Sequence, residues 1–255
     1  MKTDAPWWET FYSNHYAETM FQLDQDYLKQ ASDFILHHLQ LEPGKIVLDQ
    51  CCGIGNISLL LGKMKISVIG IEQSLGYVRQ AQERARLAEL NCQFIAADAF
   101  TYISNIPLDA AFNWHTSFGY TSDDKQNRRM LENAFASLKP GGLFLLDFIN
   151  LAYVFKHFRP IMITYHPTRD GLVEVIRESN PDLASGMLNQ NWTFVYPGAE
   201  ERLTQFTATK MYQPYQLGEL LKLSGFELIA YFGNLMGEPI SFDTPRCICL
   251  ARRPL

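Results

Sequence analysis

A short apolar strand runs directly into a glycine-bearing turn between residues 45 and 55. The segment 47–55 reads VLDQCCGIG, and residues 56–64 continue with helical spacing. Gly53 and Gly55 have no Cβ, so the backbone at these positions can approach a ligand closely. In open α/β sheets, ligands bind at such turns, beyond the carboxyl ends of the strands. The segment therefore predicts a ligand site at the edge of a parallel sheet.

Strands and helices alternate through the first 150 residues. The strands are nearly continuous in Val, Ile, Leu and Phe, which is typical of a parallel sheet covered by helices on both faces. The strands are expected at residues 45–49, 66–71, 92–96, 109–114 and 143–149, and the helices at residues 24–41, 56–64, 74–90 and 123–138, the last closed by the turn LKPGG.

The pattern changes near residue 159. From there to residue 212, four β-type stretches are separated by turn residues such as Arg169-Asp170-Gly171, which favours an antiparallel insertion over further strand–helix units. A helix at 215–224 and strands at 226–232 and 246–251 follow. With the five earlier strands, these two give a main sheet of seven.

Acidic residues follow the second and third strands. Glu72 ends the second strand, and a carboxylate there can accept two hydrogen bonds from a ribose diol. Asp98 ends the third strand, placed to meet an adenine amino group while Phe100 covers the ring. Either acid alone also fits a helix cap or a solvated turn. Together with the glycine turn, they predict a site for a nucleoside-containing cofactor.

These segments resemble a known family. The order VLDQCCGIG, GIEQS, AADAF, LDAAFNWHTSFGY, LKPGG and LFLLDFIN is similar to that of class I S-adenosylmethionine-dependent methyltransferases, over about residues 24–150. The later YQPYQLGELLKLSGFELIAYFG is similar to the closing helix and strand of that family. SFGY and SFDTPRCICLARRP resemble a broad subgroup of small-molecule methyltransferases that has a β-rich insertion.

The resemblance implies the fold and its division. We expect one α/β domain, a Rossmann-like, seven-stranded, mostly parallel sheet with helices on both faces, plus the antiparallel insertion. Its parts would be an N-terminal helical lid, a cofactor-binding core, the β insertion, and a C-terminal helix with strands that complete the sheet. The corresponding ranges are 1–41, 42–158, 159–212 and 213–255.

The resemblance also implies the cofactor, S-adenosylmethionine, with S-adenosylhomocysteine as product. By position, Asp49 and the 51–55 loop would contact its methionine end, Glu72 its ribose and Asp98 its adenine. Trp114 and His115 would pass near the methionine carboxylate and the sulfonium. The predicted cofactor-binding residues are Asp49, Cys51, Gly53, Gly55, Glu72, Gln73, Asp98, Ala99, Phe100, Trp114 and His115.

Cys51 departs from the family pattern, which usually has glycine at this position. Its side chain would crowd the cofactor unless the loop shifts, and this favours a second hypothesis, a non-catalytic binding module on the same fold. A nicotinamide dinucleotide site is a weaker alternative, because the loop lacks the third glycine that packs beneath a pyrophosphate. Methylation of a protein or peptide is a further alternative.

Charge and cysteine content suggest the partners. The net charge is −5, from 22 basic and 27 acidic residues, so no nucleic acid is expected as partner. No apolar run approaches the ~20 residues of a membrane-spanning helix, so no membrane partner is expected either. The resemblance implies a small-molecule acceptor. None of the five cysteines has zinc-site spacing, so no metal is predicted. The N-terminal segment lacks the apolar core of a signal peptide, and a cytoplasmic location is expected. Oligomeric state is not predicted.

Methyl transfer needs a general base only if the acceptor arrives protonated. His115 and Tyr16 are the catalytic candidates, and His115 could equally line the pocket. The acceptor atom is left open as oxygen, nitrogen or carbon. The other polar candidates are Tyr12, His15, Asn150, Tyr153 and His157, while His166 is expected at the surface.

Overall fold

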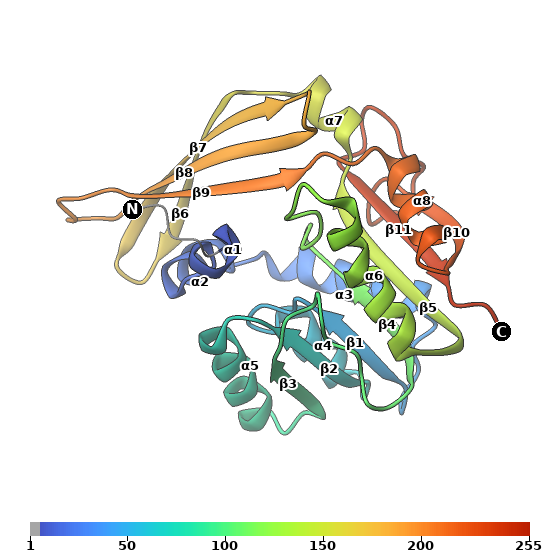
Figure 1. The fold of residues 1–255 in the computed structure, drawn as a ribbon. Helices are drawn as coiled ribbons and strands as arrows, with labels where there is room; N and C mark the ends of the chain where they lie inside the picture. Colours follow the sequence, from blue (N-terminus) through green and yellow to red (C-terminus); the bar gives the residue numbers. More distant parts are fainter. Residues whose placement is uncertain (1–5) are drawn as a thin grey trace.

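The computed structural model describes residues 6–255 and contains two β-sheets (Figure 1). Residues 1–5 of the expected N-terminal lid lie outside this range. The larger sheet has seven strands in the order β10-β11-β5-β4-β1-β2-β3. Their bounds are β1 Ile46–Gln50, β2 Ser67–Glu72, β3 Cys92–Ala96, β4 Leu108–Asn113, β5 Leu138–Ile149, β10 Glu227–Phe232 and β11 Arg246–Arg252.

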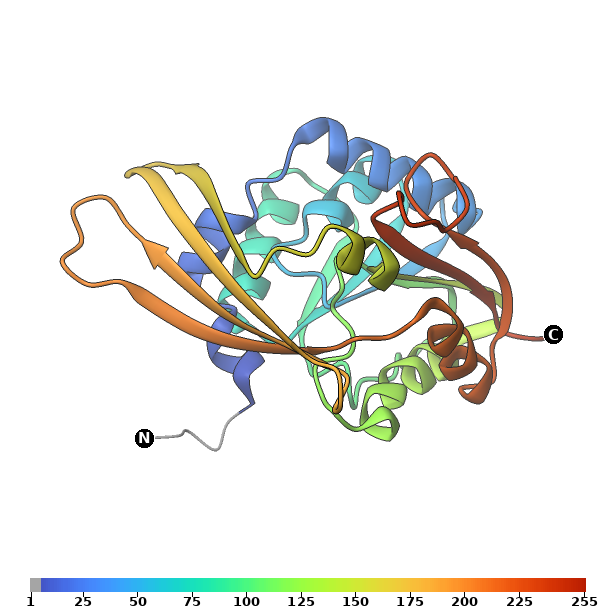
Figure 2. The same cartoon turned by 90° about the horizontal axis from the view of Figure 1, so that it is seen from above.

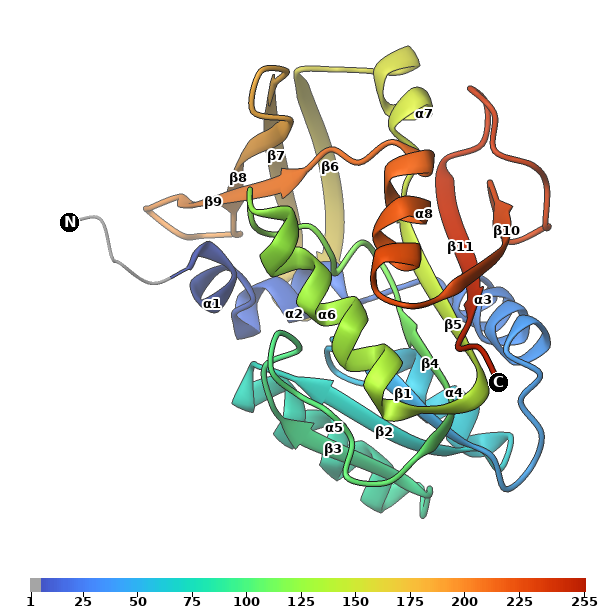
Figure 3. The ribbon, with the colours of Figure 1, turned by 45° about the vertical axis from the view of Figure 1, so that its right-hand side comes forward.

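Pairs among β1 to β5 are parallel, and β11 is antiparallel to both of its neighbours. Helices cover both faces, with α6 and α8 on one face and α3, α4 and α5 on the other (Figure 3). The fold class expected from the sequence is confirmed. The helices are α3 Gln25–His38, α4 Asn56–Lys63, α5 Leu75–Leu87, α6 Asp124–Ser137 and α8 Pro214–Leu223.

The continuous apolar strands are explained by this two-sided packing. Val47 packs among the residues of α3 and α4, while its neighbour Leu48 packs among those of α6 and α8. Successive side chains of a strand point to opposite faces. Because helices cover both faces of this sheet, both side chains are almost fully buried. Each face of the sheet thus has its own apolar core.

The second sheet is antiparallel, in the order β6-β7-β8-β9, with bounds Ile161–Thr168, Gly171–Asp182, Met187–Val195 and Leu203–Lys210. It extends beyond the carboxyl edge of the main sheet, and the short helices α1 (Trp7–Phe11) and α2 (Asn14–Met20) lie between it and the core (Figure 2). Val173, Val175 and Phe194 pack against Tyr16 and Met20 of α2.

Two local expectations were wrong. A helix, α7 Leu151–Lys156, follows β5 where none was expected, and the Asn150 side chain caps it by accepting from the Ala152 amide at 3.1 Å. Strand β5 also begins earlier than expected, because Leu138 pairs with Leu108 and the LKPGG segment continues the strand. Within residues 6–255, no helix is both long enough and apolar enough to span a membrane.

A buried ion pair joins β5 to β11. Arg246 donates two hydrogen bonds to Asp147, at 2.7 and 2.6 Å, and the Asp147 side chain is 1% exposed. The Asp147 carboxylate also accepts from the His115 amide at 2.9 Å. One carboxylate therefore connects the C-terminal strand, the fifth strand and the loop after β4.

We predict that Arg246→Met lowers the free energy of unfolding by about 3 kcal/mol or more, because it leaves the Asp147 carboxylate buried without its cation. Urea-induced unfolding measures the loss. Lys156→Met is the control, since it breaks an exposed pair with Asp243 and should cost less than about 1 kcal/mol. Equal losses in the two variants would contradict the assigned role of the pair.

Candidate active site at the carboxyl edge of the sheet

The loop between β1 and α4 has a backbone that suits glycine. Gly55 is the N-cap residue before α4 and has φ +77°, and a Cβ there would lie 2.8 Å from the Phe94 ring. Cys51 also has positive φ, +66°, which non-glycine residues rarely adopt. Its Sγ lies 3.9 Å from the Ser117 carbonyl oxygen and packs against the apolar core. The loop therefore keeps a glycine-type backbone at Cys51.

Glu72 connects two loops at the end of β2. Its carboxylate accepts from the Gly53 amide at 3.1 Å and from the Ser74 amide at 2.9 Å. Burial raises the pKa of Glu72, and these hydrogen bonds oppose the rise. Ser74 precedes α5 as expected, but its side chain forms no cap bond. Each carboxylate oxygen retains a second lone pair, so Glu72 can still accept hydrogen bonds from a diol.

The loop after β3 forms the next part of the site. One oxygen of Asp98 accepts from the Phe100 amide at 2.8 Å, and the side chain is otherwise exposed. Phe100 is half-buried, and its ring centroid lies 6.0 Å from that of Trp8. Trp8 belongs to the N-terminal segment, residues 6–23, which contains α1 and α2. A planar base can be contacted by these aromatic rings while Asp98 accepts from an amino group.

Asp49 lies below the loop. It is buried and accepts from the Ser58 hydroxyl at 2.6 Å. Burial raises the pKa of Asp49 to about 7; the Ser58 hydrogen bond opposes this, and the nearby Glu72 adds to it. A ligand ammonium group beside Asp49 would favour its ionised form.

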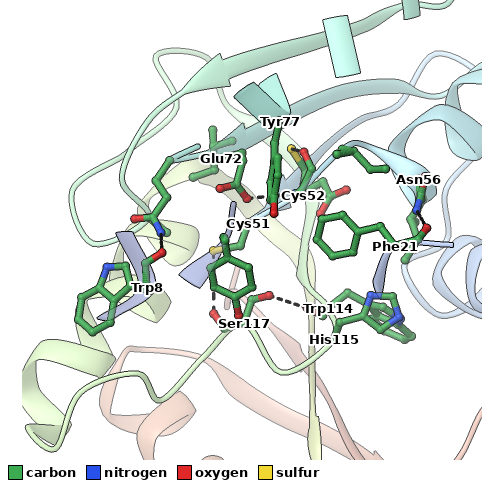
Figure 4. Close-up of a pocket in the computed structure, with 18 of the residues that line it drawn as sticks. Trp8, Phe21, Cys51, Cys52, Asn56, Glu72, Tyr77, Trp114, His115 and Ser117 are labelled. Carbon is green, nitrogen blue, oxygen red and sulfur yellow. Dashed lines mark hydrogen bonds between the residues drawn. The ribbon is translucent and has the colours of Figure 1, made fainter. Parts of the chain in front are cut away.

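These elements enclose a first pocket of about 310 Å³ (Figure 4). Glu72 and Tyr77 lie on one side of it, and Trp114 and His115 lie on the opposite side. Gly55 is the one predicted cofactor-binding residue that does not line this pocket. The others all line it, namely Asp49, Cys51, Gly53, Glu72, Gln73, Asp98, Ala99, Phe100, Trp114 and His115.

The N-terminal segment covers the first pocket and is anchored to the same loops. Tyr77 donates to the Ser13 carbonyl at 2.6 Å, Gln73 donates to the Trp8 carbonyl at 3.0 Å, and Asn56 donates to the Phe21 carbonyl at 3.1 Å. The Phe21 ring lies over Gly53, where a Cβ would be 3.3 Å away. These contacts tie the position of this segment to the loops that form the pocket.

His115 lies at the far side of the first pocket, in a strained turn. His115 and Thr116 have φ of +57° and +61°, and such strain in non-glycine residues is frequent at functional sites. Asp147 accepts from the His115 amide, and Tyr27 hydrogen-bonds with the ring at Nε2, 2.9 Å away. The residue is exposed toward the pocket. The protein atoms packed around its ring displace water that would stabilise the charged form, and this lowers the pKa of His115 to about 4.

A second pocket of about 650 Å³ lies between the antiparallel sheet, α7 and the N-terminal segment. Tyr153 and His157 of the predicted candidates line it. Its lining also includes four residues of the first pocket, which are Tyr12, Tyr16, His115 and Tyr120. Burial raises the pKa of Tyr16 to about 12, so its hydroxyl stays protonated at neutral pH.

Three other sequence candidates lie outside both pockets. Asn150 is fully buried and donates to the Ser241 and Thr244 carbonyls, so its side chain has a structural role. His15 is exposed beside Tyr196, and His166 hydrogen-bonds to Thr164 on β6, at the surface as expected.

Sequence reasoning missed Tyr77, Tyr120 and Arg177. Tyr120 ends the SFGY segment that was singled out, and its hydroxyl hydrogen-bonds to that of Tyr12. Tyr77 and Arg177 carry no local signal, because one lies on a helix face and the other in a β-strand whose register sequence alone leaves open.

Comparison with known proteins agrees with this geometry. Residues 47–142 match the family described as "Methyltransferase domain". A 23S rRNA (uracil(1939)-C(5))-methyltransferase RlmD from Shewanella sp. (strain MR-4) is 37% identical over 76 residues, which cover 30% of this chain and 16% of that protein. The chain therefore spans only a small part of the curated relative it matches.

Solved structures match over nearly the whole chain. The CcbJ methyltransferase from Streptomyces caelestis has a TM-score of 0.81 at 15% identity and covers 97% of this chain and 99% of its own. CalS10, an amino pentose methyltransferase from Micromonospora echinaspora solved with S-adenosylmethionine bound, has a TM-score of 0.66 at 18% identity and covers 89% and 90%. At these identities, the likeness establishes the fold.

The family match makes residues 47–142 a methyltransferase domain. Over nearly the whole chain, the fold is the one found in solved methyltransferases, one of them with S-adenosylmethionine bound.

The exclusion of nucleic acid as a partner was wrong. The expectation rested on net charge, but the matched curated relatives include rRNA methyltransferases. Net charge is an average over the whole chain, and it does not determine the potential inside a particular cleft.

We predict that Asp49→Asn stabilises the protein by an amount that depends on pH. The pKa of Asp49 is about 7 in the folded protein, while its ordinary value is 3.8. Between these two pH values, Asp49 is ionised in the unfolded chain but keeps its proton in the folded protein. The stability of the wild type therefore falls through this window, whereas the amide does not titrate.

The difference in unfolding free energy, variant minus wild type, should rise from pH 3.8 to about pH 7 and then level off. Urea titrations at several pH values measure it. A difference that does not vary with pH would contradict the raised pKa of Asp49.

Proposed function

We propose that this protein transfers the methyl group of S-adenosylmethionine to a small-molecule acceptor. The observation that carries the proposal is the junction of the two pockets, which share Tyr12, Tyr16, His115 and Tyr120. A donor in the first pocket and an acceptor in the second would meet at these side chains. Both pockets have the size usual for small-molecule sites.

The first pocket suits the cofactor. Its charged lining residues Asp49, Glu72 and Asp98 are all acidic, which complements a ligand that carries a sulfonium and an ammonium. We assign the ribose hydroxyls to Glu72, the adenine to Asp98 and Phe100, and the methionine end to the 49–55 loop with Trp114. When bound, the cofactor supplies an electrophilic methyl group.

The chain's own residues orient the reactants and exclude water. An acceptor nitrogen or oxygen at the junction forms the new bond to the methyl carbon as the sulfur–carbon bond breaks, and a protonated acceptor releases its proton. The N-terminal segment, anchored through Ser13, Trp8 and Phe21, shields this exchange from solvent.

His115 and Tyr16 have different roles in this proposal. With its pKa lowered to about 4, His115 is neutral at physiological pH and can accept a hydrogen bond or a proton from the acceptor. Tyr16 is protonated, so it serves as a hydrogen-bond donor that orients the acceptor. Neither residue is needed to activate the cofactor itself.

RNA methylation is a second candidate, favoured by the match to the rRNA enzyme. That match covers only 30% of this chain, so it leaves most of the chain without a counterpart in the rRNA enzyme. A transfer assay with radiolabelled S-adenosylmethionine separates the candidates when small amines, phenols and carboxylic acids are offered beside total RNA and a protein extract. Absence of transfer despite cofactor binding would favour a non-catalytic module.

We predict that Glu72→Gln weakens S-adenosylhomocysteine binding by ~1–3 kcal/mol, because the amide loses one acceptor and turns a donor toward the Gly53 or Ser74 amide. Calorimetric titration measures the affinity, with NAD as a ligand control. Glu83→Gln, which alters an exposed carboxylate on α5, should leave it unchanged. Wild-type affinity in Glu72→Gln would remove the ribose assignment.

We predict that His115→Ala lowers turnover more than it lowers S-adenosylhomocysteine affinity, because the ring lies at the junction of the pockets. If His115 accepts the proton, the turnover of the wild type should be flat across neutral pH, well above its pKa of about 4. Steady-state rates on the acceptor found in the transfer assay measure both effects. Undiminished turnover in His115→Ala would make the ring a pocket wall.

A further inference from the structure

The second pocket differs from the first in the sign of its charged side chains. The first pocket is lined by three carboxylates and by neither Lys nor Arg. The second is lined by Arg159, Arg177 and two histidines, and by neither Asp nor Glu among the described residues. This contrast occurs in a chain whose net charge is −5, so it is local to the pocket.

Arg177 is the more deeply placed of the two cations. It lies on β7 between Met162 of β6 and Trp192 of β8, its register partners. Its Cζ lies 5.1 Å from the Trp192 ring centroid, and one of its terminal nitrogens lies 3.1 Å from the Met162 sulfur. The stacked ring fixes the plane of the guanidinium group.

The guanidinium group has no anionic partner in residues 6–255. Arg177 is in none of the ion pairs there, and its Nε is buried without a hydrogen-bond partner. Burial lowers the pKa of Arg177, and nearby Tyr16 opposes this effect. Arg177 as a whole is half-buried, and its buried Nε has lost water without gaining a hydrogen-bond partner. Such a donor is costly to leave unsatisfied, which points to an anion supplied from outside.

A neighbouring hydroxyl adds a second donor. Ser179 lies two residues further along β7, and therefore on the same face of the sheet. Its oxygen accepts from the Gln190 side chain at 2.9 Å, which leaves its own O–H free to donate. Arg177 and Ser179 thus present N–H and O–H donors from one face, an arrangement that suits a carboxylate or phosphate oxygen pair.

We propose that Arg177 binds an anionic group, a carboxylate or phosphate, on a small acidic acceptor. The inference rests on the proposed function for the role of the second pocket. Because Arg177 is near Tyr16 at the junction, the anion would fix the acceptor with its nucleophilic atom toward the first pocket. Arg177 then determines the specificity of the enzyme for acids over their neutral analogues.

Benzoate, phenyl phosphate and benzamide are suitable probes, because Phe11 and Trp192 supply aromatic walls to the pocket. Calorimetric titration measures their binding to the full chain. We expect at least one of the two anions to bind, benzamide to bind about tenfold more weakly, and Arg177→Met to abolish that difference. The anion that binds more tightly identifies carboxylate or phosphate as the preferred group.

Two variants serve as controls. Arg177→Lys keeps the charge but loses the planar fork, so it should retain part of the anion preference. Arg169→Met removes an exposed arginine from the β6–β7 hairpin, outside the pocket, and should bind like the wild type. S-adenosylhomocysteine should bind equally to all of these proteins, which reports that the variants are folded and that the first pocket is intact.

Equal binding of benzoate, phenyl phosphate and benzamide, or no binding of either anion, would overturn the proposal. So would a single-stranded RNA oligonucleotide that displaces benzoate and loses affinity in Arg177→Met, because the anion would then be a nucleic-acid phosphate. Failure of S-adenosylhomocysteine to bind any of these proteins would instead reject the proposed function, while the anion preference still decides the role of Arg177.

Discussion

The Asp147 carboxylate is the charge around which the active-site edge is organised. It lies buried at the end of β5, where only the bidentate pairing with Arg246 and the His115 amide compensates for its loss of water. Arg246 comes from the last strand, which runs antiparallel to β5. The strained turn at His115 and Thr116 is therefore fixed by the end of the chain, and with it one wall of both pockets.

A second carboxylate has the equivalent role on the opposite wall. Glu72 accepts hydrogen bonds from the Gly53 amide in the loop after β1 and from the Ser74 amide in the loop after β2. The glycine turn and the start of α5 are therefore fixed relative to each other. The N-terminal segment then attaches to the same loops through its own backbone carbonyls. These backbone contacts add to the packing of its side chains, such as the Phe21 ring over Gly53.

The opposite charges of the two pockets give a physical reason for the way the insertion is used. A cationic donor suits the acidic first pocket. The second pocket, lined in part by the antiparallel sheet, contains Arg177, which has no anionic partner among the described residues. Such a division keeps donor and acceptor sites distinct although they share four side chains. In the proposed function, the edge of the main sheet holds the cofactor, and residues of the insertion select the acceptor.

The sequence by itself determined the α/β class, the glycine turn, the carboxylates at the strand ends and most element bounds, because local periodicity and strand-end chemistry depend on neighbouring residues. Only the tertiary structure decided that Cys51 keeps a glycine-type backbone, that Arg246 fixes the turn at His115, and that Tyr77 anchors the N-terminal segment. It also decided that Arg177 faces a pocket. These features join residues far apart in the chain, and strand register and packing, which no local pattern encodes, bring them together.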